Sequence, residues 1–532
     1  MGSGHILVYA FDVLIQLYSA EGYRERDAAE LILQHNLFGL DIDKRAFQLS
    51  YFALMMKGRQ HSRRLLNKGI KPNIYTVPDN FGIGETELQL VNMTFHDDSK
   101  GKEDLLKLIN GFKNGNELGS LIKFDGIDFD NLKEILKADT ISMLEQGIRE
   151  MIYVGEILQQ TYDISITNPP YMGSSGFNQT LSKFSKKNYP NSKNDLFAMF
   201  IERWNLSVKT DGYNTMVTMQ SWMFLSSYES MRKNILQNYT ISNMMHMENM
   251  VMGIAFGTVV TIFRNNQLNG FKGSYHQIKT DNVLNGVTPE IIPIPGNRFN
   301  EISQEKYKKI PGQPISYWVS ENTINNFVIE KKMSEYGIIK SGIMVNSRYI
   351  LSWYEVNEKK INFCCRSIKE MENWKWFPLN SGGGKRKWFG NNIPIINLKN
   401  KGEEIKHSNT NYRLRNTNFY FKPGITWGRI TSGDISFRKS PEGNLFGDAG
   451  PMMFINEHLF QILGLSNSKV MLYLADVINP TLNFQVDDMK NMPVIIRNEK
   501  NVYEIVDMLI ELSKNDWNCF ESSWAFTNHP LV

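Results

Sequence analysis

Four consecutive residues combine rigid backbone acceptors with an aromatic side chain. Asn168-Pro169-Pro170-Tyr171 directly follows the apolar segment 163–167. Proline fixes φ and carries no N–H, so the carbonyls at this point are held rigidly and stay unpaired. Acceptors at a fixed spacing suit an exocyclic amine with two hydrogens to donate, and an aromatic ring beside them can stack on a base. We therefore take all four as candidate catalytic residues; the alternative is a proline-rich turn after a strand.

A second candidate site pairs a glycine-rich start with a later acid. Gly2-Ser3-Gly4 leads into a segment with helical apolar spacing, and such a turn lets a nucleoside cofactor approach the backbone closely. Asp41 ends a short apolar segment 37 residues after Gly4, and a carboxylate there can bind ribose hydroxyls. Asp43 ranks second. The alternative for Asp41 is the N-cap of the helix that follows.

The elements around these residues alternate between two periodicities. Helical spacing predicts helices over 6–18, 24–35, 44–56, 104–114, 132–158, 228–238 and 502–517. Apolar runs predict strands over 36–41, 163–168, 215–219 and 259–263. This rhythm is typical of a doubly wound α/β sheet, in which ligands bind at the carboxyl ends of the strands. Asp41 and Asn168 both stand at such ends.

Charge is unevenly distributed along the chain. The net charge is +4, yet residues 331–440 hold 21 Lys or Arg against 8 Asp or Glu, a surplus of 13. A basic block in an otherwise acidic protein favours contact with a phosphate backbone, and the alternative is a solvated basic face. The candidate DNA-binding residues lie near aromatic or glycine residues within this block: Lys385, Arg386, Lys387, Arg413, Arg415, Arg429 and Arg438. Arg413 and Arg415 are two apart, so on a strand they share one face.

Several protein classes are disfavoured. The three cysteines have no C-x-x-C spacing, which argues against a disulfide framework and against a zinc cluster. No apolar run reaches the roughly 18 residues that span a bilayer, and the first residues lack the pattern of a signal peptide. We expect a cytoplasmic protein with no metal and no membrane partner.

The order Gly2-Ser3-Gly4, Asp41 and Asn168 to Tyr171 resembles the gamma-type class of adenine-N6 DNA methyltransferases. Residues 253–263 look like the later motif of this class whose aromatic packs against the flipped base; Phe256 is the candidate, with core packing as the alternative. Residues 194–200 resemble the motif whose helix lines the methionine end of the cofactor pocket. Longer stretches resemble the methyltransferases of BREX phage-defence systems and their restriction-modification relatives with their own target-recognition domain.

This resemblance implies a Rossmann-like methyltransferase domain that uses S-adenosyl-L-methionine, and a mixed α/β target-recognition domain. Asn168, through its side chain, and Pro169, through its carbonyl, would accept the hydrogens of adenine N6 while Tyr171 stacks on the base. Gly2, Ser3, Gly4, Asp41 and Asn168 would bind the cofactor. Partners would be double-stranded DNA and other phage-defence proteins. The class also has Asp-Pro ahead of its glycines, which this sequence lacks, so we expect an internal piece of a longer protein.

A change in pattern near residue 266, with recurrent prolines beyond it, predicts the domain boundaries. We expect the methyltransferase domain over 1–270, a linker over 271–330, the target-recognition domain over 331–500 and a helical end over 501–532. Two other functions remain open. One is a catalytically silent DNA-binding fragment, and the other is methylation of a protein glutamine, against which the basic region argues.

Overall fold

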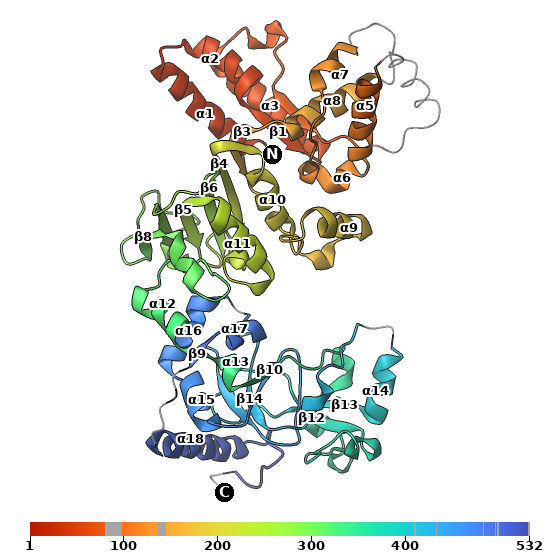
Figure 1. The fold of residues 1–532 in the computed structure, drawn as a ribbon, viewed down its shortest axis with the longest axis vertical. Coiled ribbons are helices and arrows are strands. Elements are labelled where there is room, and N and C mark those ends of the chain that lie inside the picture. Colours follow the sequence, from red (N-terminus) through yellow and green to blue (C-terminus); the bar gives the residue numbers. More distant parts are fainter. Residues whose placement is uncertain are drawn as a thin grey trace. The chain divides into compact units, whose positions relative to one another are not determined.

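The computed structural model describes residues 1–79, 98–135, 145–408, 411–431, 433–481, 483–494, 496 and 500–529. The chain forms two compact units, drawn in Figure 1. Unit 1 comprises Met1–Gln220 and Lys233–Ile302, and unit 2 comprises Ser221–Arg232 and Ser303–Val532. Each unit has its own hydrophobic clusters.

Unit 1 begins with helices that pack around a short parallel pair of strands. Strands β1 (Phe38–Asp41) and β2 (Asn73–Thr76) pair in register from Phe38 with Asn73 to Asp41 with Thr76. The surrounding helices are α1 (His5–Ala20), α2 (Glu25–Leu31), α3 (Lys44–His61), α5 (Ser99–Gly111), α6 (Gly115–Leu118), α7 (Phe129–Ile135) and α8 (Glu145–Gln159). Asp43 is the N-cap of α3, because its carboxylate accepts the N–H of Arg45. The capping role considered for Asp41 therefore belongs to its neighbour.

A six-stranded mixed sheet forms the rest of unit 1, in the order β3-β4-β6-β5-β7-β8. Strands β3 and β4 are parallel, so Thr167 at the end of β3 lies beside Met216. Strand β6 is antiparallel to both β4 and β5. The elements are β3 (Tyr162–Thr167), α9 (Gln179–Asn188), α10 (Leu196–Asn205), β4 (Val208–Met219), α11 (Glu229–Asn238), β5 (Thr240–Met247), β6 (Thr258–Arg264), β7 (Lys272–Ile278) and β8 (Phe299–Ser303).

The fully buried Arg203 fixes α10 against the turn that leads into β3. Its guanidinium donates to the carbonyls of Ile122 and Leu158, with nitrogen–oxygen distances of 2.7–3.2 Å. Leu158 lies just before β3, and α10 packs against β4. Carbonyl partners offset the desolvation of the buried cation. The strand that precedes Asn168 and the helix after residue 195 are thus tied together.

Unit 2 contains two four-stranded sheets, ordered β10-β17-β14-β15 and β11-β13-β12-β16, and the small pair β18-β9. Its strands are β9 (Lys331–Lys332), β10 (Gly337–Lys340), β11 (Ile350–Ser352), β12 (Trp376–Asn380), β13 (Pro394–Asn397), β14 (Gly424–Trp427), β15 (Phe437–Ser440), β16 (Leu445–Phe446), β17 (Met452–Ile455) and β18 (Pro493–Val494). Its helices are α12 (Glu321–Ile329), α13 (Met333–Tyr336), α14 (Lys399–Lys406), α15 (Leu459–Ser466), α16 (Lys469–Ile478), α17 (Val486–Lys490) and α18 (Lys500–Asn518).

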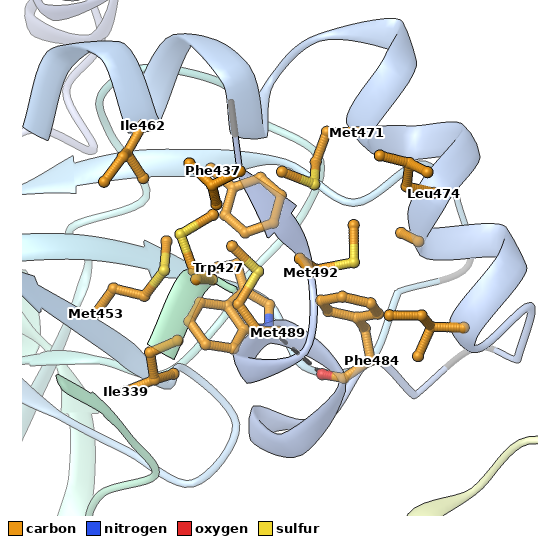
Figure 2. Packing of buried hydrophobic residues seen from close by; sticks show 14 of the residues in the cluster. Ile339, Trp427, Phe437, Met453, Ile462, Met471, Leu474, Phe484, Met489 and Met492 are labelled. Atoms are coloured by element: carbon orange, nitrogen blue, oxygen red, sulfur yellow. Dashed lines mark hydrogen bonds between the residues drawn. The ribbon is translucent and has the colours of Figure 1, made fainter. Parts of the chain in front are cut away.

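The larger core of unit 2 is built around Trp427. This side chain is completely buried, and Figure 2 shows it among Phe437, Phe484 and several methionines. Its indole N–H donates to the Phe484 carbonyl at 3.3 Å, which satisfies its one polar group. Flexible methionines fill the irregular space between the sheet and helices α15 to α17.

The predicted fold class, a Rossmann-like α/β domain followed by a mixed α/β domain, is confirmed in outline. The strands predicted around residues 36–41, 163–168, 215–219 and 259–263 are all present. The stretch 271–330, predicted as a linker, instead contains β7, β8 and α12. Strands β7 (KGSYHQI) and β8 (FNEIS) each hold only two large apolar residues, so their apolar pattern is weak although four residues of β7 are buried.

Candidate active site

The turn after β3 presents the four predicted catalytic residues in alternating environments. Asn168 and Pro170 are exposed, whereas Pro169 is buried and Tyr171 is half-buried. β3 ends at Thr167, so Asn168 stands at the carboxyl end of a strand, where open α/β sheets bind ligands. An exposed amide beside a buried proline gives the turn one accessible polar side chain on a fixed backbone.

Tyr171 links this turn to the neighbouring strand. Its hydroxyl lies 3.0 Å from Asn168 Oδ1 and 3.1 Å from the carbonyl oxygen of Val217 on β4. A phenol has one hydrogen to donate, and both oxygens are acceptors, so this group holds the Asn168 amide near β4. Burial raises the pKa of Tyr171, which keeps the hydroxyl protonated. The aromatic residue predicted to stack on a base therefore also orients the asparagine.

Asp195 fixes the other end of the turn. Its Oδ1 accepts the N–H of Met172 at 3.1 Å and the N–H of Phe197 at 3.3 Å, so it caps α10 and holds the residue after Tyr171. Leu196 N–H donates back to the Met172 carbonyl at 3.1 Å. Burial raises the pKa of the Asp195 carboxyl, and the backbone N–H donors oppose that shift. We did not predict a role for Asp195, although its place within the 194–200 motif was a usable signal.

Two aromatic side chains enclose the Tyr171 ring. The ring centroid of Phe256 lies 5.9 Å from that of Tyr171 at an interplanar angle of 70°, and that of Phe197 lies 6.2 Å away at 88°. Phe256 is half-buried, so it is not a core residue in the ordinary sense. Its packing against Tyr171 places it beside the turn, as the prediction for Phe256 requires. No ligand contact tests its role on a base.

The predicted cofactor residues also meet. Gly2 N–H donates to Asp41 Oδ2 at 2.8 Å, and the amine of Met1 lies 3.3 Å from the same oxygen. Gly4 has φ +87°, and a Cβ added there would meet Ser50 at 3.0 Å, so this position requires glycine. Ser3 hydrogen-bonds His5 at 2.6 Å.

The Asp41 carboxylate is kept ionised by its hydrogen bonds. Burial works to raise the pKa of Asp41, but the N–H groups of Asp43 and Gly2 and the charge of the terminal amine together lower it. Its side chain is 16% exposed. A half-buried carboxylate beside a glycine turn fits the hydroxyls and backbone contacts of a nucleoside. The residues present are therefore compatible with the expected cofactor.

Most of the predicted DNA-binding residues are tied to the protein itself. Lys385 pairs with Asp434 at 2.5 Å, and Arg386 pairs with Asp516 at 2.5 Å. The other intramolecular partners are the Asn467 carbonyl for Lys387 and the Asp448 carboxylate for both Arg415 and Arg429. Asp448 also accepts from Ser341 at 2.5 Å. Much of the local positive charge is therefore neutralised within unit 2.

Two parts of the basic prediction need correction. Arg438 is only 2% exposed and donates to the Gly382 carbonyl at 2.7 Å, so it supports the glycine turn rather than a bound DNA. Burial lowers the pKa of Arg438 to about 10. Arg413 and Arg415 do not share a strand: Arg413 makes an isolated bridge with Met344 and is exposed, whereas Arg415 turns inward to Asp448.

Within the described ranges, no group of three or more His, Cys, Asp or Glu side chains is arranged to hold a metal ion. None of the helices in that part of the chain has the length and apolar character needed to cross a membrane.

Sequence comparison connects this geometry with known enzymes. The family model of the Eco57I restriction-modification methylase matches residues 35–251. The adenine-specific methyltransferase PglX of Lacticaseibacillus casei (strain Zhang) is 37% identical over 567 residues, which cover 100% of this chain and 46% of that protein. The adenine-specific methyltransferase BrxX of Escherichia coli O9:H4 (strain HS) is 36% identical, with the same coverage. The chain spans about half the length of these curated relatives.

Solved structures show the same fold at low sequence identity. The type IIL restriction-modification enzyme MmeI, solved in complex with DNA, matches 99% of this chain and 65% of its own with a TM-score of 0.53 at 11% identity. A nuclease-deletion mutant of the type ISP enzyme LlaGI, bound to a DNA substrate mimic, matches 96% of this chain and 44% of its own with a TM-score of 0.51, also at 11% identity. Along its whole length the chain is similar to PglX and BrxX, and the resemblance to adenine-specific methyltransferases predicted from its motifs is confirmed.

Proposed function

We propose that this chain is the methyl-transferring and DNA-reading part of an S-adenosyl-L-methionine-dependent enzyme that methylates adenine N6 in duplex DNA, in a phage-defence or restriction-modification system. The observation that carries the proposal is the turn at Asn168, held by the Tyr171 hydroxyl on one side and by Asp195 on the other. Its conformation is set before any substrate arrives. The N6 amine of a flipped adenine has two hydrogens to donate, so a preorganised pair of acceptors suits it.

The chemistry assigned to each residue is limited to binding and orientation. The cofactor supplies an activated methyl group. Asn168 Oδ1 and the Pro169 carbonyl accept the two N6 hydrogens, which directs the nitrogen lone pair out of conjugation and toward the methyl carbon. The bound cofactor would supply the methyl group with its sulfur as the leaving group, and one N6 proton would leave to solvent. Tyr171 would stack on the base, with Phe256 packed edge to face against the Tyr171 ring, and Asp41 with the Gly2–Gly4 turn would hold the nucleoside of the cofactor.

The DNA-reading part of the proposal rests on unit 2. Its relatives MmeI and LlaGI were solved with DNA, and residues 331–440 have a surplus of 13 positive charges. Of the predicted contacts, Arg413 and Lys385 are exposed. Arg415 and Arg429 share the Asp448 carboxylate, so two cations meet one acid and one positive charge of this group stays uncompensated by it. Participation of other phage-defence proteins is carried by the resemblance alone.

A titration and a transfer assay test this function together. S-Adenosyl-L-methionine should bind saturably to the chain, and Asp41→Ala should weaken binding at least tenfold, because a ribose ligand is lost. Asp43→Ala is the matched control, since this neighbouring acid only caps α3. With unmethylated plasmid DNA, labelled methyl groups should appear on adenine N6. Cofactor binding without any transfer to DNA would contradict the proposal.

A second candidate, DNA binding without methyl transfer, has one observation in its favour. Asp41 Oδ2 already accepts from Gly2 N–H and its Oδ1 accepts from Asp43 N–H, which leaves both oxygens less free for a ribose. This candidate predicts salt-sensitive DNA binding and no cofactor titration signal. The same two measurements therefore separate the two functions.

A further inference from the structure

A ten-residue connection between β5 and β6 carries Phe256, and both of its ends are anchored. At the start, the Glu248 carboxylate accepts from Gln277 at 3.0 Å and from Thr280 N–H at 3.3 Å. Between the ends, Met250 and Met252 are exposed, at 53% and 48%. Within the connection, the Met250 N–H donates to the Ile254 carbonyl at 2.8 Å, so Phe256 stands between this turn and the anchor at the far end.

That anchor is Gln220, the residue after the end of β4. Its N–H donates to the Gly257 carbonyl at 3.0 Å. Its side-chain amide lies so close to Gly257 that an added Cβ would stand 2.5 Å from it. Because residue 257 is glycine, the side-chain amide of Gln220 can pack directly against the backbone next to Phe256.

A histidine holds the Gln220 amide in this place. His246 Nε2, on β5, lies 2.5 Å from Gln220 Oε1, which requires the hydrogen to be on Nε2 because an amide oxygen only accepts. Burial, with a smaller effect of Arg298, lowers the pKa of His246 to about 4, so the ring is neutral near pH 7. Strand β6 lies between β4 and β5, and the pair therefore reaches across the strand that Gly257 precedes.

We infer that Gln220 and His246 are positioning residues for the target base: they hold the backbone at Gly257 so that the Phe256 ring stays against Tyr171. The inference rests on the proposed function for its effect on catalysis, but the positioning itself is a property of unit 1. Neither residue contacts the reacting atoms. They act through Phe256, as a misplacement of about an ångström in a pocket wall lowers turnover by up to 100-fold.

The first test follows the connection itself and needs no activity. Hydrogen exchange is measured on the full chain. Gln220→Met and His246→Ala should each speed the exchange of the backbone amide of residue 220 and of the backbone amides in residues 248–257 by about tenfold. Gln220→Glu keeps the acceptor oxygen and should restore most of the protection. His276→Ala, on the same sheet but packed on Phe299, is the matched control and should leave this connection unchanged. Unchanged exchange in both positioning variants overturns the inference.

The second test asks whether the effect passes through Phe256. His246→Ala and Gln220→Met should lower the kcat of adenine methylation by 10- to 100-fold, with cofactor affinity and plasmid affinity within twofold of the parent. In a Phe256→Ala background, His246→Ala should add less than a twofold loss, because the group it positions is already gone. An equal loss in both backgrounds means that His246 acts elsewhere and overturns the inference. If the parent chain transfers no methyl group, the proposed function fails, and the exchange experiment still decides the positioning.

Discussion

The two regions singled out from the sequence behave differently in the structure. In unit 1, residues far apart in the chain converge: Gly2 contacts Asp41, and Tyr171 contacts both Val217 and Phe256. In unit 2, most of the basic residues are neutralised by acids or bound to carbonyls, and Arg438 is buried. A motif of specified residues at specified spacing encodes a geometry. A local surplus of Lys and Arg describes only a composition, and individual residues within it can stabilise the fold instead of binding DNA.

The largest effect that tests this contrast is expected at the centre of the motif. Asn168→Ala should lower methyl transfer to adenine by at least about 1000-fold, because an exposed acceptor for the developing charge is lost. Plasmid binding should remain within twofold of the parent. Turnover measured with labelled cofactor, beside a DNA-binding titration, checks both expectations. Normal turnover in this variant would sink the assignment of the whole turn.

Replacing Asp195, which holds the end of the turn that carries Asn168, should also lower methyl transfer, though less than replacing Asn168 itself. Asp195→Ala leaves two backbone N–H groups without their acceptor, so we expect a loss of about 1–3 kcal/mol in unfolding free energy and at least a tenfold fall in kcat. Asp43→Ala removes another helix N-cap, remote from Asn168 in the chain, and should cost about 1 kcal/mol with no change in kcat. Denaturant unfolding and steady-state kinetics provide the readouts. Equal effects on kcat in the two variants would contradict the role of Asp195 in holding the turn after β3.

In unit 2, Arg438 should affect stability rather than DNA affinity. Arg438→Ala removes a buried side chain and its bond to the Gly382 carbonyl, so the free energy of unfolding should fall by about 2–4 kcal/mol. The folded fraction should bind plasmid DNA with the affinity of the parent. Thermal unfolding and an affinity measurement on the native fraction test this pair of outcomes. A specific loss of affinity at full stability would restore Arg438 to the DNA surface.

Arg413 should give the smallest effect and the opposite pattern. Arg413→Ala should weaken DNA binding several-fold and reduce the slope of log affinity against log salt by about one, with unfolding free energy unchanged within 0.5 kcal/mol. Lys385→Ala is the matched control, because Lys385 is already paired with Asp434 and should change affinity less. If the two variants weaken binding equally, the ion pair in the free protein does not decide which cations contact DNA.

Some elements of the fold could be predicted from the sequence and others could not, for physical reasons. Strand β3 and helix α3 were predictable because their apolar periodicity is a local property of the sequence. Strands β7 and β8 were missed within the predicted linker, since each holds only two large apolar residues and the buried positions of β7 include a glycine and a glutamine. Asp195 was missed as a site residue because one of its hydrogen bonds reaches Met172, 23 positions away, while the other only caps its own helix.

The sequence by itself determined the residues of the candidate site and the class of chemistry they suit, because Asn168-Pro169-Pro170-Tyr171 and the spacing from Gly4 to Asp41 are written in the order of the chain. Only the tertiary structure decided how these residues are held. The Tyr171 hydroxyl reaches Val217, and Gln220 reaches His246 and Gly257, across strands that are neighbours in space. It also decided which arginines face solvent, because burial depends on the packing of segments distant in sequence.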